Sequence, residues 1–432
     1  MTDPLTRSSR YIDTGVLDGP VDELSLALSE VGDGIAMIDG FSHVIALQTT
    51  DGIVQFDTSL PVFARGAIAA RRAWSADPVH TLVYTHGHVD HVGGASMLLD
   101  DATARNERRP DVVSHEGVPR RFARYDRTNG YNAWINFRQF GSTGLTGQDD
   151  DAPPTFWDRW VQPSVTFDDD LSLRVGDTDL VLHHGRGETD DHAWIWLSEH
   201  KAAVVGDFMI WVFPNAGNPQ KVQRYPLEWA QTLRRIAAYE PELLLPAHGL
   251  PIEGASRIQT VLGDVAGVLE LVVGETLRLM NDGAPLDEII HSVRVPPEEL
   301  AKPWLRPVYD EPEFVVRNVW RMYGGWYDGN PSRLKPAPDA AVAAETARLA
   351  GGVDVLVDRA RVLSAAGDEP SVRLACHLVE AAVLADPSSV DAHRARAEVY
   401  SARRATELSL MAKGIFGHAA RTSQAMVDAD PA

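Results

Sequence analysis

The sequence has a single cysteine, no long apolar run and few basic residues. The lone Cys376 excludes an internal disulfide, and its apolar, helix-like surroundings predict an inert packed thiol. No stretch of about eighteen apolar residues occurs, so we expect no membrane span. The start, MTDPLTRSSRYIDTG, contains neither an apolar core nor a small-residue cleavage site, so we expect no export signal and a cytoplasmic location.

Acidic residues outnumber basic ones, 61 against 40, which gives a formal net charge of -21. Binding a phosphate backbone requires clustered Lys and Arg, so the composition argues against nucleic acid as a partner. An anionic small molecule would be repelled by the overall field. Its binding would therefore need a locally positive pocket.

The chain does have the length and apolar content for a substantial core. It has 432 residues, 44% of them hydrophobic, which suggests two or three domains. Up to about residue 260, short β-type runs alternate with helical stretches such as 61–74 and 226–240, a pattern that predicts sheets covered by helices. The Gly-, Pro- and Asp-rich segment 141–155 predicts a solvated loop.

Helical periods replace this pattern from about residue 262. Prolines in 330–340 predict a linker. Beyond it, LVEAAVLADPSSVDAHRARAEVYSA has the small-residue and Asp-Pro rhythm of a tetratricopeptide-like helix pair. We therefore predict an α/β domain over 1–260 and an all-α domain over 261–432.

The stretch LVYTHGHVDHVGGAS places three histidines and an aspartate directly after an apolar run. His86 and His88, two residues apart in an extended loop, can bind one cation, while Asp90 and His91 face a second one. Neutral imidazole and carboxylate suit Zn²⁺ or a similar metal. The alternative interpretation is an ordinary polar loop, in which the histidines are hydrogen-bonded within the protein and bind no metal.

Two cations need more ligands than this stretch supplies, and other apolar runs also end in suitable residues. Asp207 follows AAVVG, and a carboxylate at the end of a strand can bridge two metals, although an Asp there is commonly a turn residue. The remaining candidates are His183, His184, Glu188 and His192 in LVLHHGRGETDDHAWIWL, and His248 in ELLLPAHGLP.

The order and spacing of these residues over about 30–260 resemble the metallo-β-lactamase superfamily, an αββα sandwich with a dinuclear site at one edge of its two sheets. Most members have His in a GHT turn where this chain has Glu in GET. The resemblance implies Asp90 and Asp207 as catalytic carboxylates. It implies a first metal on His86, His88 and Glu188, a second on Asp90, His91 and His248, and Asp207 between them.

In having Glu at this ligand position, the chain resembles the alkylsulfatase branch of the superfamily, whose members hydrolyse sulfate esters with zinc. TLRLMNDGAPLDEIIHSVRVPPEELAK and VVRNVWRMYGGWYDGNPSRL are similar to the start of that branch's dimerisation domain. This implies a catalytic domain over 1–260, a dimerisation domain over 261–432, a homodimer and two Zn²⁺ per chain. The branch commonly has Glu in place of Asp207, and it continues into a sterol-carrier-like domain that the given sequence does not include.

The predicted mechanism uses the cations to lower the pKa of a bridging water from about 15.7 to near 7. The branch places an Asn and an Arg after its bridging acid, which implies Asn215 and Arg224 as contacts of an anionic headgroup. Tyr131 and Arg138, in the aromatic segment 124–141, are predicted to contact an organic tail. Surface or capping use of Arg224, and ordinary packing of 124–141, are the alternatives.

The leading hypothesis is a dinuclear zinc hydrolase of sulfate esters that releases sulfate and an alcohol from a small anionic substrate. The alternative is a hydrolase of the same fold for a lactone, thioester or phosphodiester. A third hypothesis, from a different class, is a scaffolding protein whose helical tail recruits partners.

Overall fold

The computed structural model describes residues 3–141 and 156–429. The chain divides into two compact units, of which the first contains 1–133, 143–283 and 288–323, and the second 134–142, 284–287 and 324–432. All but the first residue of the predicted 141–155 loop lie outside the described residues. The two units are described separately.

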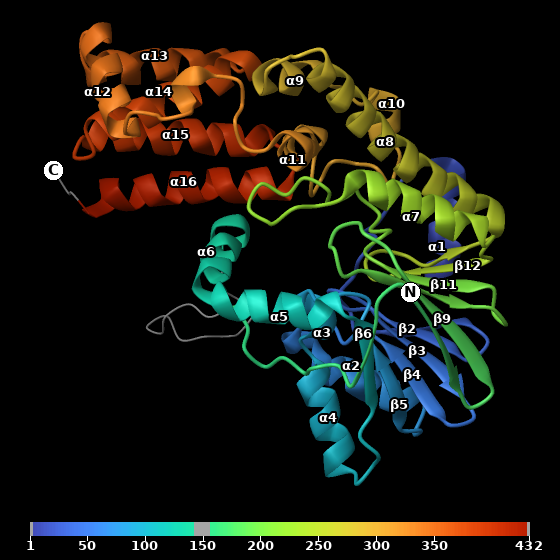
Figure 1. The fold of residues 1–432 in the computed structure, drawn as a ribbon. Helices are drawn as coiled ribbons and strands as arrows, with labels where there is room; N and C mark the ends of the chain where they lie inside the picture. The colour runs from blue at the N-terminus through green and yellow to red at the C-terminus, as the bar shows by residue number, and fades with distance from the viewer. Residues whose placement is uncertain (1–2, 142–155, 430–432) are drawn as a thin grey trace. The chain divides into compact units, whose positions relative to one another are not determined.

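The first unit contains two β-sheets, coloured blue and green in Figure 1. The first sheet has the order β1-β2-β3-β4-β5-β6-β7, antiparallel from β1 to β4 and parallel from β4 to β7. Its strands are β1 (Leu28–Gly32), β2 (Ile35–Ile38), β3 (Val44–Thr49), β4 (Gly52–Phe56), β5 (Val79–Val83), β6 (Asp111–His115) and β7 (Val165–Phe167).

The second sheet has the order β13-β12-β11-β10-β9-β8. Its strands pair antiparallel except for β11 and β12, which are parallel and so end at the same edge. They are β8 (Asp170–Val175), β9 (Thr178–His184), β10 (Ala193–Leu197), β11 (Ala202–Gly206), β12 (Leu243–Pro246) and β13 (Ile252–Glu253).

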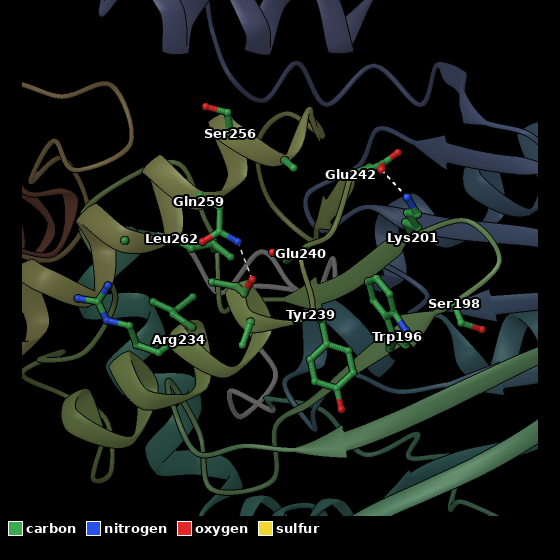
Figure 2. A pocket seen from close by; sticks show the side chains of 15 residues that line it. Trp196, Ser198, Lys201, Arg234, Tyr239, Glu240, Glu242, Ser256, Gln259 and Leu262 are labelled. Carbon is green, nitrogen blue, oxygen red and sulfur yellow. Dashed lines mark hydrogen bonds and ion pairs between the residues drawn. The ribbon is translucent and has the colours of Figure 1, made fainter.

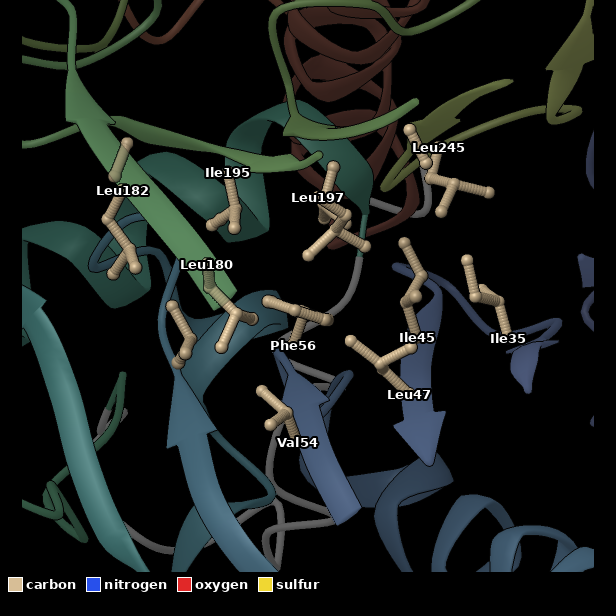
Figure 3. Close-up of a cluster of buried hydrophobic side chains, with 14 of the residues drawn as sticks. Ile35, Ile45, Leu47, Val54, Phe56, Leu180, Leu182, Ile195, Leu197 and Leu245 are labelled. Atoms are coloured by element: carbon tan, nitrogen blue, oxygen red, sulfur yellow. The ribbon is translucent and has the colours of Figure 1, made fainter. Parts of the chain in front are cut away.

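The main core lies between the two sheets (Figure 3). Ile45, Val54 and Phe56 of the first sheet pack with Leu182 and Ile195 of the second, and all are buried. Burying such apolar side chains contributes roughly 1.5–3 kcal/mol each, so this layer is a major stabilising element of the unit.

Helices cover the outer faces of both sheets, as the sequence predicts. Phe122 and Leu98 pack against Leu82 of the first sheet, and Trp229 and Ile258 are buried on the side of the second. The helices of this unit are α1 (Pro4–Thr14), α2 (Pro61–Trp74), α3 (Val89–Val92), α4 (Ala95–Ala104), α5 (Gly117–Arg127), α7 (Pro226–Ala238), α8 (Ala255–Asn281), α10 (Pro297–Leu300) and α11 (Pro312–Gly324), the last of which ends one residue beyond the unit.

The second unit is built almost entirely from helices. Small residues such as Ala360, Ala375 and Ala395 line its core and allow the helices to pack closely. The predicted helix pair is confirmed as α14 and α15, and the predicted linker contains a short 3-10 turn, Pro331–Arg333. Its helices are α12 (Asp339–Ala350), α13 (Val353–Ala366), α14 (Glu369–Ala385), α15 (Val390–Thr406) and α16 (Leu410–Ala429); α6 (Asn129–Phe140) and α9 (Leu286–Ser292) have residues in both units.

The first unit extends beyond the predicted boundary at residues 260 and 261. Helix α8 continues across that boundary to Asn281, and residues 288–323 also pack with the first unit. None of the described helices combines the length and the apolar character needed to cross a bilayer.

Candidate metal centre

Four strand ends bring the predicted ligands together in the first unit. His86 and His88 follow β5, and Asp90 and His91 lie in the short helix α3. Glu188, Asp207 and His248 follow β9, β11 and β12.

The seven side chains form two groups, in each of which the ligand-type atoms lie within 4.8 Å of one another. One group is His86, His88, Glu188 and Asp207, and the other is Asp90, His91 and His248. Asp207 faces both, with Oδ2 at 3.8 Å from His86 Nε2 and Oδ1 at 3.3 Å from His91 Nε2 and 3.5 Å from His248 Nε2. Its carboxylate therefore lies between the groups.

Most of these separations suit a coordination shell better than direct hydrogen bonds. Ligand atoms about 2.0–2.1 Å from a tetrahedral zinc lie about 3.3–3.4 Å apart. Asp90 Oδ2 lies 3.5 Å from the Nε2 atoms of both His91 and His248, and His88 Nδ1 lies 3.7 Å from Glu188 Oε2. The exception is His86 Nε2, which is 2.8 Å from His88 Nδ1.

Three atoms of the cluster are buried without a hydrogen-bond partner among the described residues: His91 Nε2, Glu188 Oε2 and Asp207 Oδ1. Buried polar atoms are costly unless something satisfies them. A cation held between these atoms would do so, and the donor set of imidazoles and carboxylates suits one. The cluster and its fold together indicate a metal cofactor.

Protonation differs between the two groups. Burial lowers the pKa of His86 and His88 well below its ordinary value, which leaves neutral rings with a lone pair for a metal. Burial also opposes charge on His248, but Asp207 and Asp90 outweigh it and raise the pKa of that ring to about 9. A cation entering the second group would therefore displace protons.

Glu188 is held by both residues that were predicted to contact a headgroup. Arg224 Nη1 lies 2.8 Å from Glu188 Oε1 and donates to the Glu188 backbone oxygen at 2.6 Å, and Asn215 Nδ2 donates to the same Oε1. Burial raises the pKa of Glu188, and Arg224, only 2% exposed, opposes that rise. The extra negative charge of a Glu in place of a His thus has a buried cation beside it.

Asp57, which the sequence analysis missed, fixes His91. Its carboxylate accepts from the backbone and hydroxyl of Thr85 at 2.8 and 2.7 Å, and it lies 2.7 Å from His91 Nδ1. With Nδ1–H donated to Asp57, the ring directs Nε2 toward Asp207 and Asp90. A signal was present, because Asp57 follows β4 directly, just as Asp207 follows β11.

The segment 188–192 supports both groups, and the sequence analysis missed Asp191 within it. Asp191 Oδ2 accepts from the backbone of Gly87, between His86 and His88, at 3.2 Å and from Arg121 Nε at 2.7 Å. His192 Nε2 accepts from the Asp207 backbone at 3.2 Å. Gly206 has φ 52°, and a Cβ there would lie 2.6 Å from His192 Nε2, so this approach requires glycine.

Other candidates from the sequence lie elsewhere. His183 Nδ1 is 2.6 Å from Asp170 Oδ1, and His184 stacks on His115 at 3.8 Å. Tyr131 is 62% exposed on α6, and Arg138 belongs to the second unit.

A cavity of about 860 Å³ lies on the outer side of the second sheet (Figure 2). Side chains of α7 and α8 line it together with Trp196 and Lys201, and Lys201 pairs with Glu242 at 2.7 Å. None of the seven clustered residues lines this cavity. The metal centre is therefore a separate feature.

Comparison with known families shows what this chain is similar to. Residues 37–248 match the model of the Metallo-beta-lactamase superfamily, and residues 285–425 match that of alkyl sulfatase dimerisation. The structure of the stereoselective inverting sec-alkylsulfatase Pisa1 from Pseudomonas sp. matches with a TM-score of 0.80 at 23% identity, over 94% of this chain and 66% of that chain. The first unit thus has the metallo-β-lactamase fold, and a helical region of the alkylsulfatase dimerisation type follows it, which confirms the predicted fold.

Curated relatives that the chain is similar to include three alkyl- or alkyl/aryl-sulfatases. A linear primary-alkylsulfatase from Pseudomonas sp. is 26% identical over 337 residues, which are 74% of this chain and 62% of the relative. An (R)-specific secondary-alkylsulfatase from Pseudomonas sp. and an alkyl/aryl-sulfatase from Saccharomyces cerevisiae are each 25% identical over 74% of this chain and 50% of their own length. The chain therefore spans one half to about two thirds of these curated relatives.

Proposed function

We propose that the protein is a dinuclear zinc hydrolase that cleaves sulfate esters to sulfate and an alcohol. The observation that carries the proposal is the position of Asp207, with one oxygen toward His86 and the other toward His91 and His248. A carboxylate so placed suits two cations side by side. The class of ester comes from the three curated relatives described above, all of which are named as alkyl- or alkyl/aryl-sulfatases.

Each of the seven clustered residues has a proposed role in holding the two cations. His86, His88 and Glu188 would hold the first cation, Asp90, His91 and His248 the second, and Asp207 both. Such cations supply Lewis acidity toward the ester oxygens and make water acidic enough to ionise near neutrality. Asp90, Glu188 and Asp207 would bring three negative charges against the four positive charges of two dications, so the centre would be close to neutral once a bound water has ionised, and an anion would need donors beside it.

The headgroup is proposed to bind beside the 214–225 loop. Asn215 and Arg224 stay candidates for this contact, although both already bond Glu188. Arg224 Nε and Asn218 Nδ2 are buried donors without a partner among the described residues. Such donors match the oxygens of a sulfate group, and they offer a local attraction that the overall charge of -21 does not.

The proposal extends to the organic tail of the substrate and to the assembly of the protein. Tyr131, a largely exposed aromatic residue, is proposed to contact the alkyl part of the substrate, and Arg138 is retained as a second candidate. The match of residues 285–425 to a dimerisation model supports a homodimer. Sedimentation analysis of the purified protein tests it, and a monomer at micromolar concentration would contradict it.

The decisive experiment is a substrate panel on zinc-loaded protein. We expect sulfate release from dodecyl sulfate, and loss of at least about a thousandfold in rate in Asp207→Asn. Metal analysis should give two zinc ions per chain, and about one in His248→Ala. His200→Ala, which changes a histidine in the turn between β10 and β11, is the matched control and should behave as wild type.

Two results would overturn the proposal. Hydrolysis of a lactone, thioester or phosphodiester without any sulfate release would keep the metal centre and remove the sulfatase assignment. Fewer than one metal per chain, with no hydrolysis of any ester, would instead favour a scaffolding role.

A further inference from the structure

The 214–225 loop carries Asn215 and Arg224, but it contains neither helix nor strand. Its peptide groups therefore need partners from elsewhere, because buried backbone N–H and C=O groups are almost always bonded. Asp310 and Asn318, about ninety residues further along the chain, bond four of these groups: the N–H groups of Gly217 and Asn218 and the oxygens of Ala216 and Arg224. Both lie within the stretch that matches the dimerisation model.

Asp310 binds the first part of the loop. Its Oδ2 accepts from the backbone N–H groups of Gly217 at 2.6 Å and Asn218 at 3.0 Å, and its Oδ1 accepts from that of Glu311 at 2.7 Å. The side chain is fully buried. Three backbone donors therefore fix one carboxylate at the start of α11.

Asn318, in α11, connects the two ends of the loop. Its Nδ2 donates to the backbone oxygens of Ala216 and Arg224, each at 2.9 Å, and its Oδ1 accepts from Gln223 Nε2 at 3.1 Å. Ala216 follows Asn215, so one side chain holds the backbone next to both residues that bond Glu188. Asn318 is 3% exposed, so no water can readily replace these bonds.

Close packing leaves the loop little room to shift. A Cβ at Gly217 would lie 2.4 Å from the backbone carbon of Phe314 and 2.5 Å from the nitrogen of Val315. The loop backbone therefore rests directly on the first turn of α11.

We infer that Asp310 and Asn318 are positioning residues for the metal centre: they hold the 214–225 loop so that Asn215 and Arg224 orient Glu188 toward its cation. The inference rests on the proposed function only in taking Glu188 as a metal ligand. It gives residues within the match to the dimerisation model a role in positioning the metal centre.

The test compares two substitutions in the same helix. Asn318→Ala removes the bonds to the loop, whereas Val319→Ala removes buried apolar volume without touching them. Zinc affinity is measured by chelator competition, and the visible spectrum of the Co²⁺-loaded protein reports ligand geometry. We expect Asn318→Ala to weaken one of the bound zinc ions by roughly 10–100-fold and to alter the Co²⁺ spectrum, with changes below about twofold in Val319→Ala.

A second variant keeps the inference testable if Asn318→Ala does not fold. Asp310→Asn keeps the shape of the side chain but places an amide against backbone donors, and it should act in the same direction. The inference is overturned if the folded variants bind zinc as tightly as Val319→Ala does. Because zinc binding is the readout, a protein that binds zinc normally but releases no sulfate would refute the proposed function without affecting this result.

Discussion

Asp57 offers the sharpest test of how the centre is built, because its carboxylate directly contacts one predicted ligand, His91. Asp57→Asn replaces the carboxylate that lies 2.7 Å from His91 Nδ1 with a neutral amide. The amide can still accept from Thr85, but it no longer offers His91 a charged acceptor.

The magnitude follows from the bond that is lost. A hydrogen bond to a charged group contributes about 1.5–3 kcal/mol, and 1.4 kcal/mol corresponds to a tenfold change in affinity. The affinity of the group containing Asp90, His91 and His248 for zinc should therefore fall by roughly 10–150-fold. This agrees with the 10–100-fold typical of residues that orient metal-bound histidines.

The assay is a two-step zinc titration against a chromophoric chelator. Asp57→Asn should weaken one zinc equivalent and leave the other within about threefold of wild type. Asp177→Asn, which removes the same charge from the turn between β8 and β9, is the control and should leave both unchanged. Unchanged affinities in a folded Asp57→Asn protein, or an equal fall in both equivalents, would refute the assigned role of Asp57.

Three further predictions test separate parts of the chain. Arg224→Leu leaves the buried Glu188 carboxylate with Asn215 as its remaining side-chain partner, and it should destabilise the metal-free protein by about 3 kcal/mol in urea unfolding. The double variant Arg224→Leu, Glu188→Gln should regain most of this loss. Additive effects of the two substitutions would contradict the pairing. Burial beside His184 lowers the pKa of His115 to about 4, so between pH 6.5 and 4 the folded state binds fewer protons than the unfolded state. The free energy of unfolding should therefore fall by up to about 1.4 kcal/mol per pH unit as the pH drops through this range. His115→Phe should reduce this slope, and an unchanged slope would contradict the role given to His115. In the second unit, a Cβ at Gly414 would lie 1.7 Å from the backbone oxygen of Gln139, so Gly414→Ala should lower the melting temperature. Gly130→Ala in the first unit, where an added Cβ meets no atom within 4 Å, should not.

Most of the fold was predictable because its signals are local. Helices α2 and α7 show apolar residues at three-to-four spacing, and the helix pair α14 and α15 shows its Asp-Pro turn in the sequence. The seven clustered residues all follow apolar runs, and the resemblance to the metallo-β-lactamase superfamily selected them from a longer set that also held His183, His184 and His192. Their roles as ligands stay a prediction until metal is measured.

The supporting residues could not be found in the same way, because contacts distant in sequence define them. Asn318 lies on a helix that looks ordinary in the sequence, and Arg121 meets Asp191 across 70 positions. The extent of the first unit was also not predictable from composition, because α11 has the same helical character as the tail beyond it. Packing, rather than pattern, assigns it to the first unit.

The fit between α11 and the 214–225 loop has a consequence for recombination among relatives. A chimera joined near residue 285, where the dimerisation match begins, would inherit α11 from one parent and the loop from another, and the carbonyls of Ala216 and Arg224 would meet a foreign helix. A crossover placed after Gly324, the last residue of α11, keeps loop and helix from the same parent. A crossover that preserves this fit between loop and helix therefore lies about forty residues downstream of the start of the dimerisation match.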